Sequence, residues 1–328
     1  MAFDFEKQKL VTELKKLKPK KVLVQLPEGI KRQATNIAET IEDLGIEVII
    51  SGETCWGGCC VYPKEAELVG ADLIVHFGHA EFIKVDYPVL YIEVKDILNL
   101  TPILEKSLES IKNIKTMGLS YSIQHRHDLN KIIKFYEDAG KKVILSKKHG
   151  KVAYEGHIVG CQYEGLKDIE DQVDGFVIIG NNFHSMGASI AVEKPVFLID
   201  VYNDEVKEMK GIRDKIIRER AISIEKFKDA KKIGIIKEVR PGQLFGNAEY
   251  LLKEIKGAGK QAIIIEMNEL TPDKLMNFYD LDGFVEIACP RIAVDDFSKY
   301  GKTVVTYKEA LVAIGKRSWE ESLEKGLL

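Results

Sequence analysis

The sequence predicts an α/β protein of three similar small α/β domains, whose parallel sheets are arranged around a pseudo-threefold axis. Two observations lead to this prediction. Short β-branched apolar runs alternate with helical periodicities along all 328 residues, which is typical of parallel sheets with right-handed crossovers. The same order of elements also returns three times, and a repeat on this scale determines the architecture of a chain.

In the first copy, the apolar run 20–26 (KKVLVQL) predicts a strand that ends before Pro27. A helix follows, capped at Gly45, and the run 46–50 is the next strand. A cysteine-rich loop, a short helix at 64–69 and strands at 71–78 and 88–94 complete this copy. Helical spacing assigns two buried faces, one of Ile30, Ala34, Ile37, Ile41 and Leu44, and one before the copy of Leu10, Leu14 and Leu17.

The other two copies follow the same plan. The second has predicted strands at 117–122, 141–147, 173–181 and 194–200, a helix face of Leu129, Ile132, Ile133 and Tyr136, and a helix that begins near His184. The third has strands at 231–237, 261–267, 281–289 and 302–308 and a helix through Leu251, Leu252 and Ile255. A long charged helix is expected over 206–229. We therefore expect domains at 1–97, 98–209 and 210–328.

Matching segments support the repeat. The helix-to-strand corners read DLGIEVII, DAGKKVIL and GAGKQAII. The third strands read GADLIVHFG, QVDGFVIIG and DLDGFVEIA, which places Asp72, Asp174 and Asp282 at equivalent points. These aspartates provide a register in which the three copies can be compared residue by residue.

The cysteines occupy informative places in that register. Cys59 lies thirteen residues before Asp72, and Cys161 lies thirteen before Asp174. Cys289 differs, since it lies at the carboxyl end of the third strand of the third copy. Ligands of α/β proteins bind outside the carboxyl ends of the strands. If these edges face one another, three thiolates converge on one point.

Three converging thiolates suit a [4Fe–4S] cluster with one iron left open, because clusters prefer soft thiolate ligands. Alternatively, Cys161 and Cys289 are small buried apolar residues. Local sites are less well supported. Cys55 and Cys59 begin a CxxxCxxC pattern, but Tyr62 stands at its third cysteine. A zinc site lacks a second ligand pair at zinc-finger spacing, and a Cys55–Cys59 redox pair lacks the CxxC spacing.

Composition excludes several classes of function. The net charge of −3, with 45% apolar and 30% charged residues, is that of an ordinary soluble protein. This charge provides no basic field for nucleic acid or an anionic membrane. No apolar run approaches the roughly 18 to 20 residues of a membrane span, and the N-terminus does not read as a signal peptide. We expect a cytoplasmic protein with reduced thiols, without nucleic-acid or membrane partners. Neither GxGxxG nor a Walker loop follows a strand.

Several short motifs together resemble a known family. They are LPEG at 26–29, WGGC at 56–59, HFGHAEF at 76–82, the Gly160–Cys161 turn, VIIGNNFHSMG at 177–187, EKPV at 193–196 and IACPRIAVDD at 287–296. In order and spacing, the chain resembles the archaeal-type diphthamide biosynthesis enzymes over nearly its whole length. These are 3-amino-3-carboxypropyl transferases, an unusual type of radical S-adenosylmethionine enzyme, which act on elongation factor 2.

The resemblance implies a site and a reaction. Cys59, Cys161 and Cys289 would bind the [4Fe–4S] cluster, one from each domain. The reduced cluster would break the Cγ–S bond of S-adenosylmethionine, and the aminocarboxypropyl group would pass to C2 of a histidine imidazole on elongation factor 2. The family also implies a homodimer and an electron donor. Cys55 departs from the family pattern, and both Cys55 and Cys60 are expected to be bystanders.

Further residues are candidates for substrate contact, each with a structural alternative. Some lie at strand ends, where a turn or a glycine lets the backbone approach a ligand. Histidines, an amide and two arginines add polar groups, and Arg291 is suited to bind a carboxylate if it is not a surface residue. The candidates are Gln25, Pro27, Glu28, Gly29, His76, His79, Gly180, Asn181, His184, Arg240, Gly242, Gln243 and Arg291. Trp56 is expected to serve packing.

Three alternatives to this function stay open at the level of sequence. The first is quinolinate synthase, which also resembles an assembly of three α/β domains, each of which gives one cysteine to a cluster with an open iron. A non-catalytic cluster protein, for electron transfer or as a complex subunit, is a second alternative. A triplicated α/β binding protein without a metal is the third.

Overall fold

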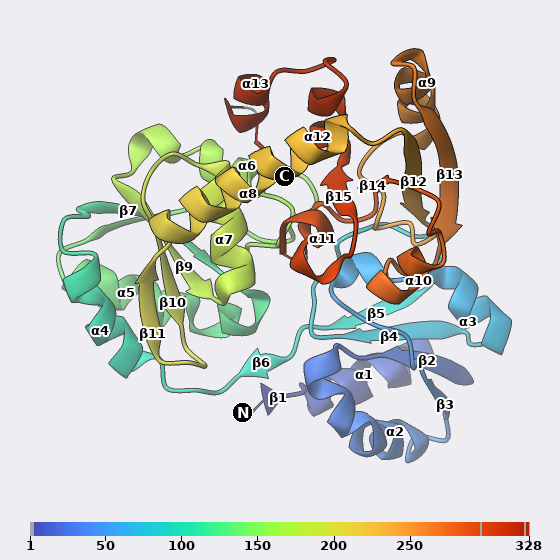
Figure 1. Cartoon of the computed structure of the whole chain (residues 1–328). Coiled ribbons are helices and arrows are strands. Elements are labelled where there is room, and N and C mark those ends of the chain that lie inside the picture. The colour runs from blue at the N-terminus through green and yellow to red at the C-terminus, as the bar shows by residue number, and fades with distance from the viewer. Residues whose placement is uncertain (1–2, 296, 325, 328) are drawn as a thin grey trace.

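The computed structural model describes residues 3–295, 297–324 and 326–327. Asp296, in the motif at 287–296, lies outside the described residues. Three sheets of four or five strands lie in successive parts of the chain (Figure 1). The α/β class with parallel sheets predicted from the sequence is confirmed. We refer below to the parts of the chain that hold these sheets as units one, two and three.

Unit one contains a parallel sheet in the order β3-β2-β4-β5. The strands are β2 (Lys21–Gln25), β3 (Glu47–Ile50), β4 (Leu73–Phe77) and β5 (Val89–Ile92). The helices are α1 (Lys7–Leu17), η1 (Glu28–Gln33), α2 (Ala34–Glu42), η2 (Gly58–Cys60) and α3 (Pro63–Val69). A short strand β1 (Phe3–Asp4) pairs with β6 (Lys95–Asp96).

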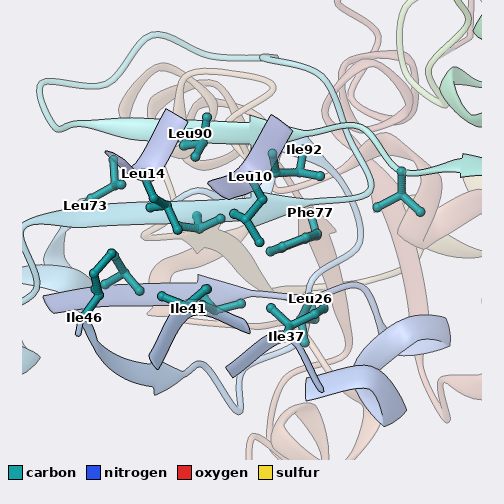
Figure 2. Packing of buried hydrophobic residues seen from close by; sticks show 14 of the residues in the cluster. Leu10, Leu14, Leu26, Ile37, Ile41, Ile46, Leu73, Phe77, Leu90 and Ile92 are labelled. Carbon is teal, nitrogen blue, oxygen red and sulfur yellow. The ribbon is translucent and has the colours of Figure 1, made fainter. Parts of the chain in front are cut away.

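The core of unit one lies between the sheet and helices α1 and α2. Leu10, Leu14, Ile37 and Ile41 point from these helices toward the strands (Figure 2). Their helical spacing creates this apolar face. Leu17 was assigned to the same face, but that prediction is wrong, since it is 52% exposed. It is the last residue of α1.

Unit two has the strand order β11-β10-β9-β7-β8. The strands are β7 (Thr116–Tyr121), β8 (Lys142–Leu145), β9 (Gly175–Gly180), β10 (Val196–Asp200) and β11 (Glu205–Glu208). The helices are α4 (Thr101–Ser110), η3 (Ile123–Asp128), α5 (Leu129–Asp138), α6 (Glu164–Lys167), η4 (Glu170–Gln172) and α7 (Asn182–Ala191). All strand pairs are parallel except β10 with β11.

The start of the predicted charged helix over 206–229 is wrong. β11 occupies Glu205–Glu208 and pairs antiparallel with β10, and the helix α8 spans Lys210–Lys228. β11 forms its backbone hydrogen bonds with the edge strand of the sheet. The charged composition of this segment does not reveal such a tertiary contact.

Unit three has the parallel order β13-β12-β14-β15. The strands are β12 (Lys232–Glu238), β13 (Gln261–Met267), β14 (Gly283–Glu286) and β15 (Thr303–Thr306). The helices are α9 (Ala248–Gly257), α10 (Pro272–Met276), α11 (Pro290–Asp295), η5 (Phe297–Lys299), α12 (Tyr307–Ala313) and α13 (Trp319–Glu324). Helix α8 crosses from unit two to this sheet (Figure 1). Its buried Arg220 donates to Glu309 and to the Ala293 and Val304 carbonyls, which fastens α8 to unit three.

The three matched aspartates make the same contact in each unit. Asp72 accepts backbone N–H groups of Lys20 and Lys21 at 2.7 and 2.9 Å. Asp174 and Asp282 accept the equivalent pairs, at 2.8 Å for both bonds of Asp174 and at 2.8 and 2.7 Å for Asp282. Each carboxylate thereby joins the start of the third strand to the start of the first.

These contacts make the stability of the protein sensitive to acid. The paired backbone N–H bonds lower the pKa of Asp72, Asp174 and Asp282. A depressed folded-state pKa contributes stability above the unfolded value of about 3.9, and this contribution is lost as pH falls through the folded pKa. We expect Asp174→Asn to lower the melting temperature at pH 7 and to change it less at pH 3. Asp171→Asn, at an exposed neighbour, serves as the control; equal shifts at both pH values would contradict the assignment.

None of the helices within the described ranges combines the length and apolar character needed to span a membrane.

Candidate functional site

The three cysteines singled out by the sequence lie close together. Cys59 is in η2, Cys161 is in a turn between the bridged residues Val159 and Gln162, and Cys289 follows β14. A hydrogen bond with Cys60 and burial raise the pKa of Cys59, and the nearby Cys289 and Cys161 thiols raise it further. Like charges have this effect only at short range. The three units therefore place one thiol each around a common point.

Close backbone approach explains several glycines around Cys59. A Cβ at Gly58 would lie 2.7 Å from the Ala80 carbonyl oxygen. A Cβ at Gly242, in the turn after β12, would lie 2.5 Å from Cys59 Cα. Real Cβ atoms do not approach other atoms so closely, so only glycine fits at either position. Gly242 thus brings unit three directly against the cysteine loop of unit one.

Two polar side chains of the same turn reinforce that contact. Arg240 is 4% exposed and donates to the Thr54 carbonyl at 3.2 Å and to Cys60 Sγ at 3.7 Å. Gln243 is equally buried and donates to Cys60 Sγ at 4.0 Å. Its Oε1 has no hydrogen-bond partner among the described residues. The substrate contact predicted for Arg240, Gly242 and Gln243 stays a prediction, and the contacts present here hold the cysteine loop.

Arg291 joins the other two cysteines. Its Nη1 donates to the Gly160 carbonyl and to the Tyr163 hydroxyl, both at 3.0 Å. Its Nε and Nη2 donate to Asp295 at 3.1 and 2.9 Å, and its guanidinium stacks 4.0 Å from the centre of the Phe183 ring. Arg291 is 2% exposed, so the surface alternative is wrong. The carboxylate that it binds in this structure is Asp295.

Burial keeps the thiols of Cys161 and Cys289 protonated at neutral pH. It raises the pKa of Cys161 to about 12, and burial together with Glu286 and Cys161 raises that of Cys289. Metal binding must displace these protons, so the affinity of such a site depends on pH. Three partly buried soft donors from three units fit the ligand set of a [4Fe–4S] cluster with one open iron.

Cys60 has definite contacts, although the sequence treats it as a bystander. The Trp56 N–H donates to its Sγ at 3.2 Å, in addition to Arg240 and Gln243. Hydrogen bonds from the thiols of Cys55 and Cys59 are the main reason why the pKa of Cys60 lies well below its usual range. Cys60 therefore organises the loop that presents Cys59.

Five buried or partly buried histidines lie near one another, and two of them, His76 and His79, lie near Cys60. Burial lowers the pKa of His76 and His184 to about 3 and that of His79, His125 and His157 to about 4. Each ring is therefore neutral at physiological pH. The rings of His157, His79 and His125 lie near enough to His184 to lower its pKa further.

Several of these rings have unused hydrogen-bonding atoms. Both ring nitrogens of His125 and the Nδ1 atoms of His157 and His184 are buried, without a partner among the described residues. Native proteins rarely leave buried polar groups unpaired, and such groups suggest a ligand or an ordered water. His125 and His157 were not predicted from the sequence. The only signal was their position after strands of unit two, where no recognisable motif marks them.

The four candidates for substrate contact at the end of β2 make their contacts within unit one. Gln25 hydrogen-bonds to His76 at 3.1 Å and to Glu65 at 3.2 Å. Glu28 binds Lys31 at 2.7 Å and accepts the Cys55 N–H at 3.4 Å. Pro27 packs closely on Gly78, and a Cβ at Gly29 would meet nothing within 4 Å. Substrate contact by these four residues stays a prediction.

The candidates of unit two lie at the start of α7. Asn181 caps this helix and accepts the His184 N–H at 3.4 Å. A Cβ at Gly180 would lie 3.2 Å from His184 Nδ1, so the ring approaches the end of β9. A substrate role for Gly180, Asn181 and His184 is still a prediction, supported by the free Nδ1 of His184.

The expectation that Trp56 serves packing is wrong. Trp56 is 64% exposed, three residues before Cys59. Phe183, which lies against Gly160 beside Cys161, is 39% exposed, and Leu244, next to Gln243, is 47% exposed. Each unit thus places one exposed apolar side chain near the cysteine site.

A cavity of about 630 Å³ lies elsewhere in unit two. It is lined by residues 97–101 before and within α4, and by residues between His127 and Asp138 along α5. No cysteine lines it, so its size does not make it the candidate site.

Comparison with known proteins gives consistent similarities. Residues 26–324 match the family described as "Putative diphthamide synthesis protein". The chain is 31% identical over 97% of its length to the 2-(3-amino-3-carboxypropyl)histidine synthase of Pyrococcus horikoshii, and covers 92% of that protein. It is 30% identical over 95% of its length to subunit 1 of the Kluyveromyces lactis synthase, and covers 75% of it. The crystal structure of Dph2 from Pyrococcus horikoshii with a 4Fe-4S cluster superposes with a TM-score of 0.88 at 31% identity, covering 96% of this chain and 92% of that chain.

Proposed function

The chain belongs to the diphthamide synthesis protein family, and from that premise we propose that it is a 2-(3-amino-3-carboxypropyl)histidine synthase. It uses a [4Fe–4S] cluster to cleave the Cγ–S bond of S-adenosylmethionine reductively, and it transfers the 3-amino-3-carboxypropyl group to a histidine of elongation factor 2. The observation that carries this proposal is the proximity of Cys59, Cys161 and Cys289, each from a different unit.

In this proposal the three thiolates hold the cluster and leave one iron open. When bound and reduced, the cluster supplies the electron that breaks the sulfonium Cγ–S bond. The protein supplies position. Gly242 and Arg240 hold unit three against the Cys59 loop, and Arg291 holds the Cys161 turn against the Cys289 segment. The same contacts exclude water from the space in which a reactive fragment forms.

The partnerless ring nitrogens support a polar ligand in that space. We assign His125, His157 and His184 to the amino and carboxylate groups of S-adenosylmethionine. Because burial keeps these rings neutral, each would donate an N–H or accept one without adding charge. Neutral rings also avoid electrostatic repulsion of the positively charged sulfonium, which imidazolium groups would cause.

Product analysis tests the reaction directly. Anaerobically reduced protein is incubated with S-adenosylmethionine and elongation factor 2. Mass spectrometry is expected to show an added aminocarboxypropyl group on one histidine, with methylthioadenosine in solution. Deoxyadenosine as the main product would contradict the proposed bond cleavage.

The family match favours this reaction over the quinolinate synthase alternative. Cluster and S-adenosylmethionine binding without any product would instead favour the non-catalytic cluster protein. Protein that stays colourless after anaerobic reconstitution would favour the metal-free binding protein. A homodimer and a separate electron donor belong to the proposal as well, and size-exclusion chromatography with light scattering measures the first of these.

Trp56 is expected to contact the protein substrate. It is exposed beside Cys59, and exposed tryptophans are frequent energetic centres of protein interfaces. We predict that Trp56→Ala raises the KM for elongation factor 2 by roughly 10-fold or more, which corresponds to about 1.4 kcal/mol. Cleavage of S-adenosylmethionine without the protein substrate should change little. Leu68→Ala, at a 79% exposed site on α3, is the control; equal effects of both variants would contradict a specific role.

A further inference from the structure

A second group of metal-binding side chains lies beside the predicted cluster ligands. Cys55 follows β3 in the cysteine loop, His76 lies within β4, and His79 follows that strand. One ligand atom from each of them lies within 4.8 Å of the others. Cys55 and His76 are buried and His79 is partly buried. We propose that Cys55, His76 and His79 bind one zinc ion, at a site distinct from the [4Fe–4S] cluster.

Hydrogen bonds orient His76 as a metal ligand. Gln25 donates its Nε2 to Glu65 at 3.2 Å, which turns its Oε1 toward His76 Nδ1 at 3.1 Å. Because Oε1 only accepts, His76 Nδ1 carries the proton and Nε2 carries the lone pair. Metal-binding histidines regularly donate their second ring N–H in this way. The lone pair faces His79 Nδ1 across 3.0 Å.

The spacing suits a small tetrahedral ion. Zn–N distances of about 2.0 to 2.1 Å at tetrahedral angles place two ligand nitrogens about 3.3 Å apart. The His76–His79 pair is at 3.0 Å, so a shift of a few tenths of an ångström admits the ion. His79 must then carry its proton on Nε2 and not on Nδ1. One thiolate and two imidazoles are donors that zinc prefers, and they leave a fourth position for a water.

Cys60 separates this site from the cluster ligands. Its Sγ hydrogen-bonds to the thiols of both Cys55 and Cys59, so the two sites are neighbours that share no ligand. A bound zinc would join the cysteine loop to the end of β4 and fix the segment that presents Cys59. The proposal does not depend on the reaction proposed above.

Metal analysis in a background without cluster ligands tests this site. The full chain carrying Cys59→Ala, Cys161→Ala and Cys289→Ala is loaded with Zn²⁺, desalted and measured by plasma mass spectrometry. About one zinc per chain is expected, as for a single site. With Co²⁺ in place of zinc, the spectrum should show thiolate-to-cobalt charge transfer and the intense d–d bands of a tetrahedral ion.

Adding Cys55→Ala or His79→Ala to this background should lower the bound zinc at least about tenfold. Cys55→Ala should also abolish the thiolate-to-cobalt charge-transfer band, because it removes the thiolate. His149→Gln, at an exposed histidine that contacts Asp168, should leave both signals unchanged. Circular dichroism confirms that each variant is folded. Absence of zinc in the background chain, or zinc that persists in both site variants, would overturn the proposal.

Discussion

Replacement of any one of Cys59, Cys161 and Cys289 by alanine is expected to abolish the iron–sulfur cluster and the transferase activity. A site assembled from three units has one thiolate from each, and two thiolates cannot retain a cluster that already has one open iron. The loading should fall from about four irons per chain to nearly none. Activity should fall by more than the roughly 10- to 100-fold that is typical for changes around metal ligands.

Iron and sulfide analysis with the visible absorption of anaerobically reconstituted protein measures this effect. Cys60→Ala is the matched control, since Cys60 adjoins Cys59 but is not an expected ligand. It should keep its four irons, although the loss of the Trp56, Arg240 and Gln243 contacts should make the loop less stable. A fully loaded and active Cys161→Ala or Cys289→Ala variant would disprove the ligand assignment. That result would leave the zinc proposal intact, because it involves other residues.

Gly242→Ala is expected to have the second largest effect, although it adds only one methyl group. The new Cβ would overlap the backbone of Cys59, which cannot move aside without opening the contact between units one and three. Overpacking of this kind costs about 1–3 kcal/mol in the free energy of unfolding. Because the overlap falls on a ligand residue, we expect cluster loading and activity to fall together with the melting temperature.

Gly257→Ala, in the same unit, is the control for Gly242→Ala. Gly257 ends helix α9, and its added Cβ would meet nothing within 4 Å. Alanine should raise helix stability there by up to about 1 kcal/mol. A Gly242→Ala variant with unchanged melting temperature and iron content would show that the turn after β12 does not position Cys59.

Local chemistry explains why so much of the fold was predictable. The helix of Ile37 and Ile41 follows from periodicity alone, because one apolar face must be buried whatever lies opposite it. The strand 73–77 follows from a short continuous apolar run, and all of its residues are buried. Asp72, Asp174 and Asp282 occupy equivalent positions in the three copies, because each accepts the same two backbone hydrogen bonds. β11 was missed because it is held by its pairing with β10 and by packing on α4, and both of these contacts join distant parts of the chain.

Residues of the cysteine site were likewise predictable where a local pattern marks them, and not where only distant contacts do. From the sequence, the repeat register singled out Cys59 and Cys161, and its position at the end of a strand singled out Cys289. The family resemblance implied all three as cluster ligands. No sequence pattern selects His125 and His157, since neither lies in a recognisable motif. Trp56 was also assigned to packing, whereas exposure of that side chain depends on what the other units cover.

The sequence by itself determined the α/β class, the threefold repetition of elements and the cysteine of each copy that lies at a strand end. These features are short-range, because they depend on spacing within a helix, a strand or a turn. Only the tertiary structure decided that Arg291 reaches the Gly160 carbonyl, that Gly242 lies on Cys59, and that Cys55 meets His76 and His79. Such contacts join residues from separate elements, and in the first two cases they depend on how whole helices or units pack, which no local pattern encodes.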